Sequence, residues 1–347
     1  MTALLTVTAD EERELATTVL RAHGAGQEEA DVQARVLVEA DLRDRHSHGI
    51  QRLPTLVGRM RNGLLQPMVE PELRWVSDAF LAVDGGFGFG PATAMQAIAA
   101  LLERAARTGV ALAAVRRSSH LGMLAPYAER IADDRCVGIV LTTSEALVHP
   151  WGGRLPLVGT NPIAVAVPTA GDPFILDMST SAISMGQVLA FDQRGLELPE
   201  GAAVDADGLP TRDAGRARAG ALSPFGGAKG YALGLAVELL VAGLTTTALG
   251  ADVAGTLDVE HAVTKGDVVI VVDPRAAGVE GLEARVEAFL DELRSSPPAA
   301  GGDGVAIPGD RAREVRAMRL ASGIPLPRAL WEQLTALHVE AEELARA

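Results

Sequence analysis

The feature that most constrains the fold is a change of pattern near Cys136. Upstream of it, periodic apolar residues and capping signals predict helices at 8–21, 27–44, 49–60, 92–108 and 121–133. Between 136 and 177, short runs rich in β-branched residues alternate with Gly, Pro and Asn, which is typical of strands joined by turns. The sequence therefore predicts a mixed α/β fold with a helical part and a β-rich part.

The pattern changes again towards the C-terminus. Residues 295–302 contain only Ser, Pro, Ala and Gly, which is the composition of a linker, and we expect the tail beyond it to pack back on the helical part. With 347 residues, 48% of them hydrophobic, the chain is long enough for two domains. Further strands are expected at 73–76, 80–83, 109–115 and 268–272, and further helices at 229–244, 279–293 and 327–346.

Charge and cysteine content exclude several classes of protein. The net charge is −14, from 31 basic and 45 acidic residues, so the chain lacks the basic surface that nucleic-acid binding requires. Cys136 is the sole cysteine, which excludes an intramolecular disulfide and a cysteine-based metal site. Residues 1–14 do not resemble a signal peptide, and the apolar segment 231–248 carries Glu238 among Ala, Gly and Thr, which favours a buried helix. We expect a cytoplasmic protein that binds neither nucleic acid nor membrane.

The run Arg-His-Ser-His-Gly-Ile-Gln-Arg at 45–52 concentrates two imidazoles, a hydroxyl and a guanidinium. If the run is helical, His48 and Arg52 stand four residues apart and share one face. Arg52 would then grip a carboxylate while His48 moves a proton, which suits a small oxyacid substrate. The alternative is a solvated helix end with two incidental histidines, and the run alone favours neither.

His120 lies where a predicted strand gives way to a predicted helix. A side chain at such a junction projects into a cleft, the usual place for functional groups in α/β architectures. The alternative is a helix cap formed by Ser118 or Ser119, with His120 merely adjacent. A cap would still leave His120 free for chemistry.

Three segments have the composition of phosphate-binding turns. Residues 159–162 (Gly-Thr-Asn-Pro) form a tight turn, and the hydroxyls and backbone N–H groups at 179–181 follow a strand. In the glycine-rich segment 224–231, Lys229 falls in the first turn of a helix, where the dipole disfavours a cation unless an anion is bound. Ordinary capping and a solvated lysine are the alternatives, and the spacing is not that of a Walker A loop.

Two other signals are discounted. The glycine-rich run at 86–90 lacks the third glycine of a dinucleotide fingerprint, which would fall at Pro91, and no βαβ unit with a ribose-binding acid is evident after it. His46 and His48 are two residues apart, a spacing that suits metal binding on a strand but not on a helix. We therefore predict no metal site.

Together these segments resemble the malate/L-lactate dehydrogenase family, which also contains ureidoglycolate, sulfolactate and diketogulonate dehydrogenases and cyclic imino-acid reductases. The resemblance covers nearly the whole chain, and the ordered set of motifs is far more specific than any one of them. In order, the motifs are 47–50 with Arg52 and Pro54, 84–85, Ser118 with His120 and Gly122, 159–162, Asp177 with 179–181, 226–227 with 229–231, and 307–310.

The resemblance implies a homodimeric oxidoreductase that uses NAD or NADP and acts on a small-molecule carboxylate. It implies a non-Rossmann cofactor domain with a mainly antiparallel sheet at 116–295, and a helical substrate and dimerisation domain at 1–115 with 296–347. His120 corresponds to the acid/base histidine of the family and His48 to a second catalytic group. Substrate contacts would come from Arg52, Ser47 and the position of Leu56. Cofactor contacts would come from Ser144, Thr160, Asn161, Met178, Ser179, Thr180 and Lys229.

The chain departs from the family pattern around the expected site. Leu56 replaces a frequent tyrosine, so we expect weak activity on malate-like diacids and better activity on acids with an apolar or cyclic side chain. Further departures are Arg117 and Ser119 where asparagines are common, Gln187 for a lysine and Ala202 for a tryptophan.

The sequence thus predicts an enzyme that interconverts a 2-hydroxy acid and a 2-oxo acid by hydride transfer, or one that reduces a cyclic imino acid. Two predictions from other classes stay open. One is a catalytically silent dinucleotide-binding protein, suggested by the departures from the family pattern. The other is a metallohydrolase that uses His46 and His48.

Overall fold

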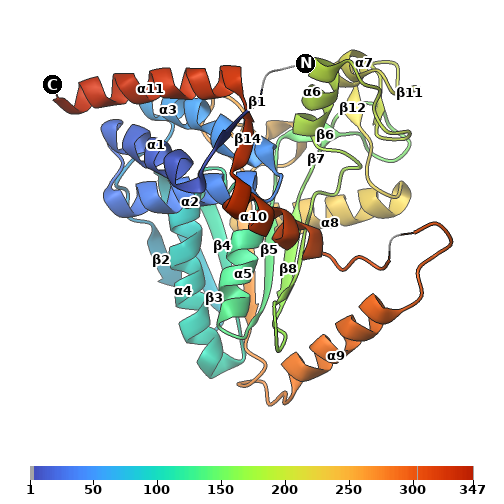
Figure 1. The fold of residues 1–347 in the computed structure, drawn as a ribbon. Coiled ribbons are helices and arrows are strands. Elements are labelled where there is room, and N and C mark those ends of the chain that lie inside the picture. The colour runs from blue at the N-terminus through green and yellow to red at the C-terminus, as the bar shows by residue number, and fades with distance from the viewer. Residues whose placement is uncertain (1–3, 303, 347) are drawn as a thin grey trace.

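A seven-stranded sheet forms the centre of the computed structural model, which describes residues 4–302 and 304–346 (Figure 1). All neighbouring strands are antiparallel except β3 and β4, which run parallel on either side of helix α4 (Gly90–Thr108). Strands β2 and β3 precede residue 115 and strands β5, β8, β9 and β13 follow it, so the sheet contains strands from both sides of the domain boundary expected at residues 115 and 116. In spatial order its strands are β2 Glu72–Trp75, β3 Phe80–Gly88, β4 Val110–Ser118, β13 Gly266–Val272, β5 Val137–Thr142, β8 Ile163–Val167 and β9 Phe174–Met178.

The β3–α4–β4 segment is a βαβ unit that the sequence pattern did not reveal. The glycine-rich run at 86–90 spans the end of β3, at Gly88, and the start of α4, at Gly90. A Cβ atom on Gly90 would lie 2.3 Å from the carbonyl oxygen of Ser119 and 2.8 Å from that of His120. Glycine at this position therefore allows the start of α4 to pack against the segment that carries His120.

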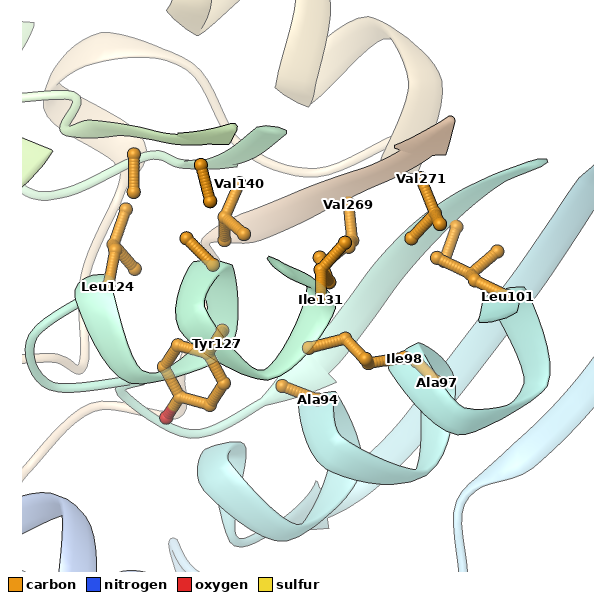
Figure 2. Close-up of a cluster of buried hydrophobic side chains, with 14 of the residues drawn as sticks. Ala94, Ala97, Ile98, Leu101, Leu124, Tyr127, Ile131, Val140, Val269 and Val271 are labelled. Carbon is orange, nitrogen blue, oxygen red and sulfur yellow. The ribbon is translucent and has the colours of Figure 1, made fainter. Parts of the chain in front are cut away.

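Helices cover both faces of the sheet. Figure 2 shows α4 and α5 (Ala125–Asp133) on one face, where Ile98 and Ile131 pack against Val269. The neighbouring residue Val268 points to the opposite face, because side chains alternate along a strand, and there it packs against Val241 of α8 (Ala228–Thr245). Among the described helices, α8 alone is long and apolar enough to span a membrane, a test that core helices of soluble proteins also pass.

The N-terminal helices and the C-terminal tail share a second core. Strand β1 (Leu4–Val7) pairs antiparallel with β14 (Ile324–Pro327), which brings the tail beside the N-terminus. Thr8 and Glu11 form the predicted capping box at the start of α1. The helices of this layer are α1 Ala9–Ala22, α2 Gln27–Leu42, α3 Leu53–Arg61 and α11 Arg328–Arg346, and α10 Asp310–Ser322 packs against α2.

A small five-stranded sheet lies apart from the main one and was not predicted. Four of its strands have only two residues, too few for an alternating pattern to be visible in the sequence. Helix α9 (Leu282–Ser295) lies at the edge of the molecule (Figure 1). The small sheet comprises β11 Pro210–Thr211, β10 Ala203–Val204, β12 Ala221–Leu222, β6 Ala146–Val148 and β7 Val158–Gly159, with helices α6 Met185–Arg194 and α7 Ala214–Ala219 nearby.

Candidate active site

A cavity with about 390 Å³ of empty space, part of it open to solvent, lies between the helical layer and the loop after β4. It brings together four of the predicted site residues, namely His48, Arg52, Leu56 and His120. The other lining residues are Gln33, Leu37, Thr55, Arg59, Ser119, Gly122 and Thr256.

The segment that carries His48 and Arg52 is not the continuous helix that the sequence suggested. It forms two 3₁₀ turns, His46–His48 and Ile50–Arg52, separated by Gly49 in an extended conformation, and α3 begins only at Leu53. The side chains of His48 and Arg52 nevertheless reach the same cavity. Tertiary contacts, rather than an i to i+4 helical relationship, bring them together.

His120 follows β4 and stacks on His48. The ring centroids are 5.7 Å apart and the ring planes differ by 18°. The backbone N–H of Gly122 donates to Nδ1 of His120 at 3.0 Å, so the neutral ring carries its hydrogen on Nε2. Nε2 is therefore the ring nitrogen of His120 that can donate a hydrogen bond to a ligand.

The predicted helix start at residue 121 is wrong. Helix α5 begins at Ala125 and its N-terminal cap position is Leu124, so neither Ser118 nor Ser119 caps it. Ser118 ends β4 and Ser119 lines the cavity. The segment 119–124 is irregular backbone that turns the chain from the sheet towards the cavity.

Both stacked histidines are neutral at pH 7. Burial, followed by the nearby charges of Arg52 and Arg45, lowers the pKa of His48 to about 4. Burial and the charge of Arg52 also hold the pKa of His120 well below its usual value, with His48 contributing. The positive charge beside the two rings is therefore carried by arginine side chains and not by the histidines.

Arg52 is placed to receive an anion. Its Nε donates to the backbone oxygen of Ser47 at 2.9 Å, and its guanidinium forms no ion pair with any described residue. The hydroxyl of Ser47 lies 3.0 Å from Nδ1 of His48, so Ser47 contacts both groups although it does not line the cavity. The two free ends of the guanidinium match the geometry of a carboxylate.

Gln33 and Arg59 are among the lining residues that were not predicted from the sequence. Gln33 on α2 is 4% exposed and makes no hydrogen bond to any described residue, which is unusual for a buried amide. Arg59 donates from Nη1 to the backbone oxygens of Asp258 (2.9 Å) and His261 (3.1 Å) and so fastens that loop beside the cavity. Gln33 interrupts the buried apolar face of α2, and that interruption was the signal available in the sequence.

The structure gathers four predicted cofactor residues into one hydrogen-bonded cluster. Asn161 is fully buried, and its amide donates to Glu238 at 2.8 Å and to the oxygen of Gly234 at 3.1 Å. The side-chain oxygen of Asn161 accepts a hydrogen bond from the backbone N–H of Ser144. The hydroxyl of Ser144 lies 3.0 Å from the hydroxyl of Thr160. The hydroxyl of Thr180 donates to the backbone oxygen of Thr160 at 2.9 Å. The side chains of this cluster fix the local fold.

Three further predicted cofactor residues lie near this cluster in sequence or space. Met178 ends β9, and the hydroxyl of Ser179 lies 3.0 Å from that of Ser181. The next helix, α6, starts at Met185 with Ser184 as its N-terminal cap. Lys229 is exposed in the first turn of α8, as predicted, and forms no ion pair or side-chain hydrogen bond with any described residue. None of the three lines the cavity.

A second cavity, with about 440 Å³ of empty space, adjoins the end of β9. Arg43 in its wall is paired with Glu129 at 2.7 Å, whereas Arg45 is exposed and forms no ion pair with any described residue. The remaining walls come from Met123, Ala125, Ile175, Asp177, Gly309, Ala312 and Arg313.

His46 does not line the cavity that contains His48. Its Nδ1 contacts the carboxylate of Asp41, and its Nε2 lies 3.4 Å from Asp44. Among residues 4–302 and 304–346, no group of three or more His, Cys, Asp or Glu side chains is arranged to hold a metal ion. This arrangement does not favour the metallohydrolase alternative.

Comparison with known proteins agrees with this geometry. A sequence model of the family described as malate/L-lactate dehydrogenase matches residues 7–335. The chain belongs to the malate/L-lactate dehydrogenase family. Its fold matches the crystal structure of a dehydrogenase from Sinorhizobium meliloti with a TM-score of 0.93, at 46% identity, covering 97% of this chain and 99% of that one.

Two relatives are named for different substrates. The malate/(S)-sulfolactate dehydrogenase of Methanothermus fervidus is 35% identical over 94% of this chain and 96% of its own length. The crystal structure of the delta1-piperideine-2-carboxylate reductase of Pseudomonas syringae pv. tomato matches with a TM-score of 0.86, at 36% identity, covering 96% and 99%. The expected resemblance is thus confirmed, and the chain is a dehydrogenase or reductase of this pyridine-nucleotide-dependent family.

Proposed function

We propose that this protein is an NAD(P)-dependent oxidoreductase that interconverts a 2-hydroxy acid and a 2-oxo acid. The observation that carries the proposal is the unpaired guanidinium of Arg52 in one cavity with the stacked rings of His48 and His120. A carboxylate on Arg52 places the adjacent C2 oxygen next to a histidine donor. This is the arrangement that carbonyl reduction requires.

The residues of the chain would supply orientation and a proton. Arg52 holds the substrate carboxylate, and Nε2 of His120 donates to the C2 oxygen. The charge of Arg52 is, after burial, one of the factors that lower the pKa of His120. A bound substrate carboxylate would neutralise this charge. Substrate binding would therefore raise the pKa of His120 and make protonation of its ring easier. The protonated ring would give its Nε2 hydrogen to the C2 oxygen and keep a hydrogen on Nδ1, so the hydrogen bond from the N–H of Gly122 to Nδ1 would have to break when the ring is protonated. The nicotinamide, when bound, supplies the hydride.

The cofactor would bind beyond the end of β9. Met178, Ser179 and Thr180 lie there, with Ser144, Thr160 and Asn161 in the adjoining cluster. Two unpaired cations support the fit to a dinucleotide. One is Lys229 at the start of α8, and the other is Arg45 in the second cavity. The pattern fits NAD and NADP alike.

We extend the proposal to organisation and location. Residues 116–295 would bind the cofactor, and 1–115 with 296–347 would supply the substrate site and the contacts of a homodimer in the cytoplasm, without nucleic acid or membrane as partner. Light scattering on the purified protein tests the dimer.

Reduction of a cyclic imino acid is a second candidate. Leu37 and Leu56 form an apolar wall of the cavity, which suits a saturated ring. The relative from Pseudomonas syringae named as a piperideine-2-carboxylate reductase supports the same possibility. The carboxylate would again bind Arg52.

A substrate panel tests the proposal. Pyruvate, oxaloacetate and a cyclic imino acid would be supplied with NADH and with NADPH, and nucleotide oxidation followed by absorbance. Turnover of an oxo acid supports the proposal, and turnover of the imino acid alone supports the second candidate. Binding of NAD(P)H without turnover of any panel member contradicts both and indicates a silent dinucleotide-binding protein.

A further inference from the structure

A buried carboxylate lies directly beneath the turns that carry His48 and Arg52. Asp41, near the end of α2, is 1% exposed. Its Oδ2 accepts the backbone N–H of Ile50 at 2.6 Å, and its Oδ1 contacts Nδ1 of His46. Asp41 therefore binds the first residue of each of the two 3₁₀ turns.

Gly49, between the two turns, shows how closely this carboxylate approaches the chain. A Cβ atom on Gly49 would lie 2.0 Å from Oδ2 and 2.2 Å from Cγ of Asp41. No side chain fits there while Asp41 keeps its place. Because the backbone of Gly49 has a negative φ, the requirement for glycine comes from the space that Asp41 occupies.

A second carboxyl group stabilises the first. Glu12 of α1 is fully buried beside Asp41, and burial followed by the negative charge of Asp41 raises the pKa of Glu12 far above its usual value. As a carboxylate, Glu12 would find no donor for either oxygen among the described residues. As a neutral acid it can donate a hydrogen bond to the neighbouring carboxyl group of Asp41.

The C-terminal tail holds the same corner from the other side. Arg319 of α10 donates to the backbone oxygen of Asp41 and, at 2.6 Å, to the carboxylate of Asp44. Asp44 has a φ of 63°, so the chain turns sharply between α2 and the first 3₁₀ turn. Elements from both ends of the chain thus meet at Asp41.

We infer that Asp41 is a positioning residue for the substrate site. It lines neither cavity, and it acts by fixing His46 and Ile50. Ser47, which contacts both His48 and Arg52, lies between these two anchored residues. Small displacements of His48 and Arg52 would reduce catalysis strongly, because the carboxylate of the substrate and the proton donor of the enzyme must be aligned at the same time. The inference rests on the proposed function only in naming the substrate as an oxo or imino acid.

The test compares two buried aspartates. Asp41→Asn keeps the size of the side chain and removes its charge. Asp205→Asn is the matched control, because Asp205 is also buried and accepts two backbone N–H groups, from Leu209 at 2.9 Å and Asp207 at 3.1 Å, in a turn that lines neither cavity. We expect Asp41→Asn to raise KM and lower kcat/KM at least about tenfold while the Kd of NAD(P)H stays within about twofold. Asp205→Asn should lower Tm and leave kcat/KM unchanged.

Two results would overturn the inference. One is a kcat/KM of Asp41→Asn within about twofold of wild type, and the other is a parallel loss of NAD(P)H affinity, which would indicate general disorder. If Asp41→Asn does not fold, Gly49→Ala decides, because it removes no charge and crowds Asp41. A folded Gly49→Ala enzyme with wild-type kinetics contradicts the inference. Wild-type protein without any turnover would contradict the proposed function instead.

Discussion

The imidazole rings of His48 and His120 stack with their centroids 5.7 Å apart in one cavity. One ring comes from a 3₁₀ turn of the helical layer and the other from the loop that follows β4. Burial, followed by the charge of Arg52, lowers the pKa of both, so the pair is neutral and the guanidinium carries the charge. Binding of an anionic substrate and donation of a proton are therefore tasks of different side chains.

Replacing His120 by alanine should remove most of the turnover. General acid–base groups contribute about 10²–10⁴-fold, and we expect a loss of kcat in that range with an unchanged Kd for NAD(P)H. His23→Ala is the control, because His23 hydrogen-bonds at the surface end of α1 and lines neither cavity. A kcat near wild type in His120→Ala, with chemistry shown to be rate-limiting, would disprove the role.

Arg52→Lys should weaken substrate use far more than cofactor binding. Lysine keeps the charge but loses the planar fork, and it cannot both bond the oxygen of Ser47 and hold a carboxylate at two points. We expect kcat/KM to fall more than about tenfold, which corresponds to roughly 1.4 kcal/mol. If KM and kcat both stay within about twofold, Arg52 is not the carboxylate ligand.

The lowered pKa values predict an unusual pH profile. A lowered pKa keeps a histidine neutral to lower pH, so His48 gains its proton only near pH 4 rather than near 6.5. Because kcat/KM reports the free enzyme, we expect it to show no histidine inflection between about pH 5.5 and 7.5, and to change as pH falls towards 4. Steady-state kinetics across this range in a buffer of constant ionic strength is the measurement. An inflection near pH 6.5 that disappears in His48→Asn would contradict the pKa shift.

Glu12→Gln should stabilise the protein increasingly as pH rises. The pKa of Glu12 is raised in the folded state, so above about 4.5 the folded state binds a proton that the unfolded state does not, and wild-type stability falls with pH. Glutamine donates to Asp41 without this cost. The difference in unfolding free energy should grow by at most about 1.4 kcal/mol per pH unit. Urea titrations at pH 5.5 and 8 test it, and a difference in unfolding free energy that does not change between these pH values would show that Glu12 is ionised in the folded protein.

The sequence predicted those helices and strands that are stabilised by contacts between near neighbours in the chain, or that carry a periodic apolar pattern over many residues. Capping signals placed the start of the first helix within one residue of α1, and the β-branched runs between 136 and 177 contain β5, β8 and all but the last residue of β9. Helix α10 was missed because Asp310–Ser322 is rich in arginine and has no clear apolar stripe. Its place depends on pairings with distant residues, such as Arg316 with Glu39 at 2.7 Å.

The same distinction applies to the site. Residue type and motif order identified His48, Arg52 and His120, because their chemistry is visible in the sequence. The 3₁₀ geometry of residues 46–52 was not predicted, since it follows from the contact of Gly49 with a carboxylate on another helix. Gln33 was missed for a related reason, because only the fold shows that its unpaired amide faces the cavity.

Lys229→Ala should mainly weaken the dinucleotide. Lys229 is an exposed cation at the start of α8, where the helix dipole favours an anion, and it has no partner among the described residues. We expect the Kd of NADH or NADPH to rise roughly tenfold, as for loss of one charged hydrogen bond, with little change in the KM of the acid. Calorimetric titration of both nucleotides measures it.

The chain offers a matched control and an independent readout for this prediction. Arg285 is also an exposed cation in the first turn of a helix without an ion pair to any described residue, so Arg285→Ala should leave nucleotide affinity unchanged. The sequence has only two lysines, and the other, Lys265, is buried and bound to Asp267 at 2.6 Å. A side-chain amine reagent therefore reports Lys229, and the nucleotide should protect it. Labelling at the same rate with and without nucleotide, together with an unchanged Kd in Lys229→Ala, would show that this lysine is a surface residue and that the anion of the cofactor binds elsewhere.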